Sequence, residues 1–319
     1  MPGKSPDDLI AAACQGDRSA LARLLSVVER GGEGARAVGR AMHGRGSEAY
    51  TVGITGAPGS GKSTLTSALV DVVRSGDDRV AVLAIDPSSP FSGGAILGDR
   101  VRMGDHALDE GVFIRSMATR GHLGGLAVAA PEAVRVLTAA GYPWVVLETV
   151  GVGQVEVEVV GQADTTLVVV NPGWGDAVQA NKAGLMEIAD VFVVNKADRP
   201  GARETARDLE RMLDIALPAS REPDRWRPPV LCATATTGDG IEGVWGAIRD
   251  HRAHLEATGG LTERRHRRAA EEVTRMVAAE LLERARSMTT SPQAAELAAA
   301  VAAGELDPWT AADRLLGDA

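Results

Sequence analysis

Aromatic side chains are scarce in this chain of 319 residues: Phe, Trp and Tyr make up 3%, whereas hydrophobic residues as a whole make up 45%. A hydrophobic core must therefore be built mainly from Val, Leu, Ile and Ala. The two cysteines, Cys14 and Cys232, lie far apart and in no metal-ligand spacing, which excludes a disulfide framework and favours a reducing compartment. A length of 319 residues allows one large domain or two small ones.

Long apolar runs and an excess of positive charge are also missing. No run reaches the roughly 18 apolar residues of a membrane span, and the first residues have no apolar segment of signal type. The formal net charge of −9 argues against nucleic acid as the main partner. We therefore expect a cytoplasmic protein that binds neither membrane nor nucleic acid.

One stretch fits a phosphate-binding pattern at every fixed position. It runs Gly56-Ala57-Pro58-Gly59-Ser60-Gly61-Lys62-Ser63-Thr64, after an apolar run at 50–55 and before a helical pattern. Glycines let the backbone curl so that its N–H groups face phosphate oxygens, and the following helix adds its positive dipole end. Lys62 would reach the terminal phosphates and the Ser63 hydroxyl would bind Mg²⁺. The stretch predicts binding of a nucleoside triphosphate.

Strand and helix patterns alternate from residue 50 to about residue 253. The expected strands are 50–55, 79–85, 112–114, 144–148, 166–170, 191–194 and 230–232. The expected helices are 62–74, 131–140, 154–162, 177–188, 202–213 and 241–253. Continuous Val, Leu and Ile runs are typical of strands buried on both faces of a parallel sheet. The order predicts a three-layer α/β/α domain with a mostly parallel sheet and its ligand at the carboxyl ends of the strands.

Both ends of the chain have helical patterns outside this domain. We predict a helical N-terminal segment at 1–48, the nucleotide domain at 49–258 and a helical C-terminal arm at 259–319. Within the first segment, 5–30 forms two short helices and the Gly- and Arg-rich stretch 31–48 forms a connection. The arm consists of a long amphipathic helix at 262–287 and two short helices at 291–319, an arrangement that often buries its apolar face in a dimer. Its basic run, 264–268, is either a solvated helix face or a salt-bridging surface for a partner or a second subunit.

Two loops indicate that the base is guanine. Asn195-Lys196-Ala197-Asp198 follows a buried strand, about 130 residues after the phosphate loop. The Asp198 carboxylate can accept the two N–H groups of guanine, whereas adenine would leave it unpaired. Lys196 can lie along the base and Asn195 can tie this loop to the phosphate loop. After the last strand, backbone groups of a small-residue loop would contact the guanine oxygen. That loop consists of Thr234, Ala235 and Thr236.

Acidic residues near the ends of two other strands suit a magnesium site. Glu148-Thr149-Val150-Gly151 stands where many GTPases have D-x-x-G, with Glu in place of Asp. Asp86 and Asp99 flank a Gly-, Pro- and Ser-rich loop that could close on Mg²⁺ and the γ-phosphate. One acid would bind the metal through water and another would orient the attacking water.

Taken together, these motifs resemble a known family. Besides the motifs already named, the chain contains D-P-S-S-P at 86–90, G-D-R-V-R-M at 98–103, R-G-H-L-G-G-L-A at 120–127 and M-E-I-A-D-V-F-V-V-N-K-A-D at 186–198. In that order they resemble the methylmalonyl-CoA mutase-associated GTPases of the MeaB/ArgK type, whose human homologue is the methylmalonic aciduria type A protein. The resemblance covers essentially the whole chain.

The resemblance implies a GTP-hydrolysing metallochaperone. Such a protein gates delivery of adenosylcobalamin to methylmalonyl-CoA mutase, or a related acyl-CoA mutase, and protects or rescues that enzyme. It implies a homodimer formed through the C-terminal arm, with GTP or GDP and Mg²⁺ as ligands. The implied metal site comprises Ser63, Asp86, Asp99 and Glu148, and the implied catalytic residues are Lys62, Asp99, Glu148 and Lys182, the last in a third mobile loop at 175–182.

Hydrolysis by the isolated chain is expected to be slow. Many signalling GTPases have a water-orienting Gln directly after the Gly of the third motif, but here that position is Val152 and the nearest Gln is Gln154. Three alternatives stay open: a GTPase that inserts another metal cofactor, an ArgK-type transport-associated ATPase or kinase, and a scaffold that uses GTP only for structure. Cys14, Cys232 and six scattered histidines make a tightly bound transition metal unexpected.

Overall fold

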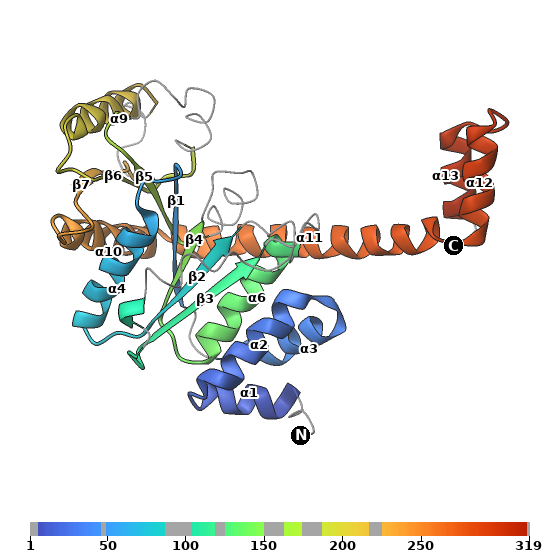
Figure 1. The fold of residues 1–319 in the computed structure, drawn as a ribbon, viewed down its shortest axis with the longest axis horizontal. Coiled ribbons are helices and arrows are strands. Elements are labelled where there is room, and N and C mark those ends of the chain that lie inside the picture. Colours follow the sequence, from blue (N-terminus) through green and yellow to red (C-terminus); the bar gives the residue numbers. More distant parts are fainter. Residues whose placement is uncertain are drawn as a thin grey trace. The chain divides into compact units, whose positions relative to one another are not determined.

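A computed structural model of the chain describes residues 6–45, 49–86, 104–106, 108–118, 125–149, 163–173, 187–216 and 225–317. Its centre is a seven-stranded, wholly parallel sheet in the order β3-β2-β4-β1-β5-β6-β7 (Figure 1). The strands are β1 (Tyr50–Gly56), β2 (Val80–Asp86), β3 (Val112–Ala118), β4 (Trp144–Thr149), β5 (Thr165–Val170), β6 (Val191–Asn195) and β7 (Val230–Ala233). All seven expected strands are present, and the predicted α/β fold is confirmed.

Helices cover both faces because successive residues of a strand point to opposite sides. Val80 and Val82 belong to the core beneath α4 (Lys62–Ser75) and α10 (Ile241–Thr258). Ala81 and Leu83 belong to the opposite core, which includes α6 (Gly125–Ala139). On that same side, Val168 of β5 packs with α9 (Ala202–Ala216). The sheet is thus buried on both faces, as the apolar runs predict.

The N-terminal helices pack onto the α6 side of the sheet. They are α1 (Pro6–Cys14), α2 (Arg18–Arg30) and α3 (Gly32–Met42). The expectation of a connection at 31–48 is wrong for most of its length, because α3 is a helix with Val38 and Met42 fully buried. Glycine is a poor helix former, but here burial of one apolar face against α2 and α6 outweighs that preference. At Gly39, an added Cβ would lie 2.6 Å from a Glu132 carboxylate oxygen of α6, which shows how closely the two helices approach.

Other boundaries differ in detail. Helix α6 begins at Gly125, six residues before the expected start, and contains Pro131 in its second turn. The short η1 (Gly104–His106) precedes β3. The expected helix at 154–162 and most of the one at 177–188 lie outside the described residues.

The chain divides into two compact units, Met1–His266 and Arg267–Ala319. Helix α11 (Gly260–Thr289) begins in the first unit and continues into the second, which also contains α12 (Pro292–Ala302) and α13 (Pro308–Gly317). The predicted three-part division remains a prediction. Among the described residues, no helix combines the length and apolar character needed to cross a bilayer.

The start of the basic run is neither a solvated face nor free to pair with a partner. Arg264 binds Asp190, and Arg265 binds Asp164, each through contacts of 2.8 to 3.0 Å within the same chain. Sequence patterning misses these pairs because the partners are 74 and 101 residues away.

Candidate nucleotide site

The carboxyl ends of the central strands bring the predicted motifs to one edge of the sheet. Strand β1 lies between β4 and β5, and β6 follows β5. The phosphate loop after β1 therefore has Glu148 of β4 on one side and the loop after β6 on the other. This is the edge at which parallel α/β sheets bind ligands.

Glycines shape the phosphate loop where no other residue would fit. Gly56 has φ of 141°, and a Cβ there would collide with the backbone carbonyl of Val169 on β5. Gly61 has φ of 86°, and its Cβ would collide with the side-chain nitrogen of Asn195. The loop can therefore approach β5 and the end of β6 and still turn into α4.

Lys62 and Ser63 begin α4, and both are buried. The Lys62 ammonium group donates to the carbonyl oxygens of Gly56 at 2.8 Å and Ala57 at 3.2 Å, so the side chain lies back over the loop that precedes it. An ammonium group held there stands beside the curled backbone, where phosphate oxygens would lie in the predicted site.

The Ser63 hydroxyl donates a 2.5 Å hydrogen bond to Glu148 Oε1. Glu148 is the fifth residue of β4 and is fully buried, so its carboxylate is held at the side of the phosphate loop away from β6. A hydroxyl and a carboxylate are hard oxygen donors of the kind that Mg²⁺ prefers. These two groups therefore fit a magnesium site.

Asn195 connects three loops. Its amide nitrogen donates to the carbonyl oxygens of Ser60 at 2.8 Å and Gly61 at 3.4 Å. Its side-chain oxygen accepts a hydrogen bond of 3.2 Å from the backbone N–H of Ala235. Because Asn195 is buried, these bonds hold the phosphate loop, the loop after β6 and the loop after β7 in one arrangement.

The loop after β6 is further shaped by Lys196. This residue has φ of 58°, a left-handed conformation that is uncommon outside glycine. Its ammonium group donates to Gly59 O at 2.6 Å, and its side chain thereby crosses to the phosphate loop. Asp198, two residues later, is exposed and so accessible to a base.

Thr234, Ala235 and Thr236 lie in a closed loop after β7. Thr234 forms an isolated bridge with Asp239, and its N–H donates to the Asp239 carbonyl oxygen at 2.9 Å. Ala197 N donates to Ala233 O at 3.0 Å, which joins the last residue of β7 to the loop after β6. The two loops assigned to guanine therefore lie side by side.

Some predicted site residues lie outside the described part of the chain. They are Asp99, Lys182 and the segment from Val150 to Gln154. Asp86 is described only as the last residue of β2, without its side chain. Their roles remain predictions.

A wholly parallel sheet with a Gly-rich loop leading from β1 into α4, beside a loop bonded to it through Asn195, defines a P-loop GTPase domain. Residues 21–290 match the model of the family described as methylmalonyl Co-A mutase-associated GTPase MeaB. The chain belongs to this family.

Individual relatives agree with that assignment. A putative GTPase of Pyrococcus abyssi is 48% identical over 310 residues, which cover 97% of this chain and 95% of the relative. The mitochondrial methylmalonic aciduria type A homolog of Mus musculus is 33% identical over 271 residues, covering 84% of this chain and 65% of that protein. A crystal structure described as an LAO/AO transport system kinase superposes with a TM-score of 0.72 at 28% identity, covering 99% of this chain and 98% of that one.

Proposed function

We propose that this GTPase is a metallochaperone that gates the loading of adenosylcobalamin onto methylmalonyl-CoA mutase, or a related acyl-CoA mutase, and protects or reactivates that enzyme. The nucleotide half of the proposal rests on the hydrogen bonds of the Asn195 side chain. They join the loops after β6 and β7 to the phosphate loop. The mutase half is supported by the family description and by the name of the mouse relative.

In the proposed cycle, Gly56 to Thr64 hold the phosphates of GTP. The Lys62 ammonium exchanges its bonds with the Gly56 and Ala57 carbonyls for bonds with phosphate oxygens. Asp198 accepts both guanine N–H groups, Lys196 lies along the base, and the Thr234–Thr236 loop faces the guanine oxygen. Adenine has neither the paired N–H groups that Asp198 would accept nor the carbonyl oxygen that faces the Thr234–Thr236 loop, so GTP is preferred over ATP.

Mg²⁺ would be held by the Ser63 hydroxyl, with Glu148, Asp86 and Asp99 as the acidic residues around it. The metal would neutralise charge that develops on the phosphates during hydrolysis. The 2.5 Å hydrogen bond between the Ser63 hydroxyl and Glu148 supports a shared role of these two residues at the metal. Asp99 and Lys182 are proposed to act on the reacting phosphate and to couple hydrolysis to the partner.

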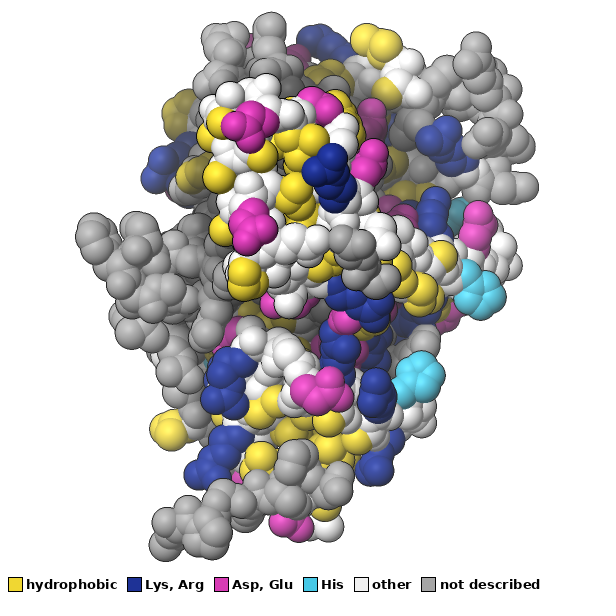
Figure 2. Space-filling view, turned by 90° about the vertical axis from the view of Figure 1, so that its right-hand side faces the viewer, with side chains coloured by type: hydrophobic (Ala, Val, Ile, Leu, Met, Phe, Trp, Pro, Cys, Tyr) yellow, Lys and Arg dark blue, Asp and Glu magenta, His cyan; other side chains and the backbone are white. Residues whose placement is uncertain are grey.

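The C-terminal unit supports the proposed homodimer. Helix α11 has no buried residue, although it carries apolar side chains at helical spacing. The exposed ones are Val273, Met276, Val277, Leu281 and Leu282, and α13 adds Trp309 and Leu316. Figure 2 faces α12 and α13 and shows apolar side chains at the surface there, among acidic ones. A surface of this kind is stabilised when a second copy covers it.

The proposal is tested by measuring GTP hydrolysis with and without purified methylmalonyl-CoA mutase. We expect slow turnover by the chain alone, well below about 10 s⁻¹, and faster turnover when the mutase is present. We also expect adenosylcobalamin transfer to the mutase to require GTP. Lys62→Ala is the control, because loss of nucleotide binding should remove both effects.

Two results would each contradict one part of this proposal. Tighter binding of ATP than of GTP would overturn the assignment of the base. If no acyl-CoA mutase changed the hydrolysis rate or bound the chain in either nucleotide state, the partner would be wrong while the GTPase assignment would stand.

A further inference from the structure

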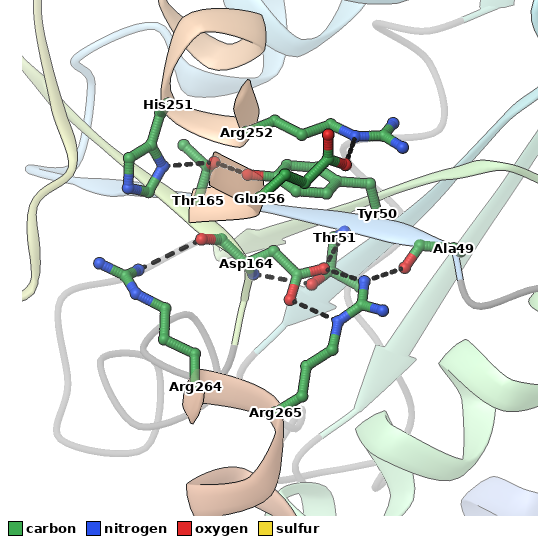
Figure 3. Close-up of polar contacts among 10 residues, drawn as sticks. All are labelled: Ala49, Tyr50, Thr51, Asp164, Thr165, His251, Arg252, Glu256, Arg264 and Arg265. Atoms are coloured by element: carbon green, nitrogen blue, oxygen red, sulfur yellow. Dashed lines mark hydrogen bonds and ion pairs between the residues drawn. The ribbon is translucent and has the colours of Figure 1, made fainter. Parts of the chain in front are cut away.

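A second polar cluster lies at the opposite edge of the sheet, where β1, β5 and β6 begin (Figure 3). It joins residues before or within these strands to His251 on α10 and to the start of α11. The nucleotide site does not use it. Its members are Tyr50, Asp164, Thr165, Asp190, His251, Arg264 and Arg265.

Asp190 is held mainly by Arg264. Arg264 Nη2 donates to Asp190 Oδ1 at 2.8 Å, and Nη1 donates to Oδ2 at 3.0 Å. The Thr166 backbone N–H also donates to Oδ2, at 2.9 Å. This paired geometry is the strong form of an Arg–carboxylate contact, and it fastens the start of α11 to the start of β6.

His251 stands beside the same carboxylate but does not bond to it. Its ring is fully buried, and Nε2 lies 3.3 Å from Asp190 Oδ1 without a hydrogen bond to any described residue. Nδ1 lies 2.8 Å from Thr165 Oγ1, which in turn lies 2.7 Å from the Tyr50 hydroxyl, as Figure 3 shows. A buried polar atom left without a partner needs an explanation.

Electrostatics select one tautomer. A carboxylate facing Nε2 favours a proton on that nitrogen, so Nδ1 accepts from Thr165 and Thr165 accepts from Tyr50. Nε2–H then points toward Asp190 Oδ1, an oxygen that already accepts from Arg264 and whose negative charge that guanidinium already neutralises. Release of Arg264 would let His251 take its place without any change in the backbone of α10.

We propose that His251 is the alternative partner of Asp190, and that the two residues form a latch for the start of α11. In the closed latch Arg264 holds Asp190. In the open latch Arg264 has left, and protonated His251 replaces it as the cation beside the carboxylate. Opening therefore takes up one proton. The proposal concerns the first turns of α11 and does not depend on the identity of any partner protein.

The charges around His251 agree with this coupling. The pKa of His251 is lowered to about 4, chiefly by burial; Asp190 and Asp164 oppose this fall, whereas Arg264 and His254 add to it. The Trp226 ring packs against it, with centroids 4.8 Å apart. Without Arg264 the ring would still be buried, but it would face two carboxylates and lose its strongest neighbouring cation, which raises its pKa above the value in the closed latch.

The sign follows from these values. Since the pKa of His251 is about 4 in the closed latch and higher in the open one, the closed latch is favoured at neutral pH and is lost progressively as pH falls through the open-latch pKa. The opening constant should rise as pH is lowered, by up to about tenfold for each unit of difference between the two pKa values.

The experiment is a histidine-labelled NMR titration of the full chain, which has six histidines. In the wild type we expect the Nε2–H tautomer and a pKa near 4 for His251. In Arg264→Met the pKa should rise, because a neighbouring cation is removed while Asp190 stays. Arg265→Met is the matched control: it removes the neighbouring pair with Asp164 and should leave the pKa of His251 near its wild-type value.

Hydrogen exchange at the first turns of α11 tests the latch without relying on Arg264→Met folding. After correction for the intrinsic rate, opening should increase as pH is lowered from 7.5 to 5 in the wild type, and this dependence should vanish in His251→Phe. The latch is overturned by a proton on Nδ1 at neutral pH, by a wild-type pKa near 6.5, or by exchange that ignores pH in the wild type.

Discussion

At the scale of single residues, Asn195 and Asp198 have different roles in the predicted nucleotide site. Asn195 is buried, and both polar atoms of its side chain form hydrogen bonds with neighbouring loops. Its role is therefore to position the backbone of those loops. Asp198 is exposed and free to meet a base. Within one short motif, Asn195 therefore positions the backbone, and Asp198 is the residue proposed to read the base.

We predict that Asp198→Asn lowers GTP affinity by about 100-fold, because the variant loses the charged acceptor and turns an NH₂ group, instead of an oxygen, toward one of the two guanine N–H groups. The Asn side chain offers one donor and one acceptor, a pattern that suits xanthine better than guanine. Competition binding with GTP, ATP and xanthosine triphosphate would measure the change. The assignment of Asp198 would be wrong if GTP bound with wild-type affinity.

At the level of elements, the site depends on which strand ends are neighbours. Strand β1 is flanked by β4 and β5, and β6 follows, so loops from distant parts of the chain meet at one edge. The N-terminal helices have a structural role instead. They cover the face of β2 and β4 with apolar side chains and provide stability to the sheet rather than contacts to a nucleotide.

Met42→Ala tests that separation. Met42 is 1% exposed at the end of α3, and its truncation should lower the free energy of unfolding by about 2–4 kcal/mol. GTP affinity should not change, since α3 packs on α2 and α6. Denaturant unfolding and nucleotide titration together give the answer. Arg40→Ala on the exposed side of α3 is the control and should cost little, because its contact with Glu33 is 4.0 Å long and exposed.

At the scale of the whole molecule, the chain combines a folded GTPase unit with a second unit that exposes apolar side chains. The start of α11 is fastened to the first unit by two Arg–Asp pairs. The part of α11 that belongs to the first unit is therefore held at the edge of the sheet opposite the predicted nucleotide site.

If a second copy covers that surface, a charge placed in it should separate the copies. We predict that Leu281→Asp converts a dimer into a monomer, because a buried carboxylate without a partner is strongly unfavourable. Light scattering after size-exclusion chromatography would show the mass. Leu108→Asp, at a position 95% exposed in the first unit, is the control. A dimer that survived Leu281→Asp would place the interface elsewhere.

The sequence by itself determined the class of the protein and most of its strands. Phosphate and guanine loops are short contiguous motifs, and strands buried on both faces appear as unbroken apolar runs, so local pattern is enough to find them. It failed at α3, where five glycines between residues 31 and 44 suggested a loop and only packing against α2 and α6 made a helix.

Tertiary structure decided everything that joins distant residues. The Asn195 bond to the phosphate loop spans 135 positions, and the Arg264 bond to Asp190 spans 74. The periodicity of a sequence does not predict such pairs, because they depend on the order of the strands in the sheet and on which polar groups are buried next to one another. For the same reason the sequence gives no sign that His251 is buried beside Asp190, the carboxylate that pairs with Arg264. Only the folded structure shows it.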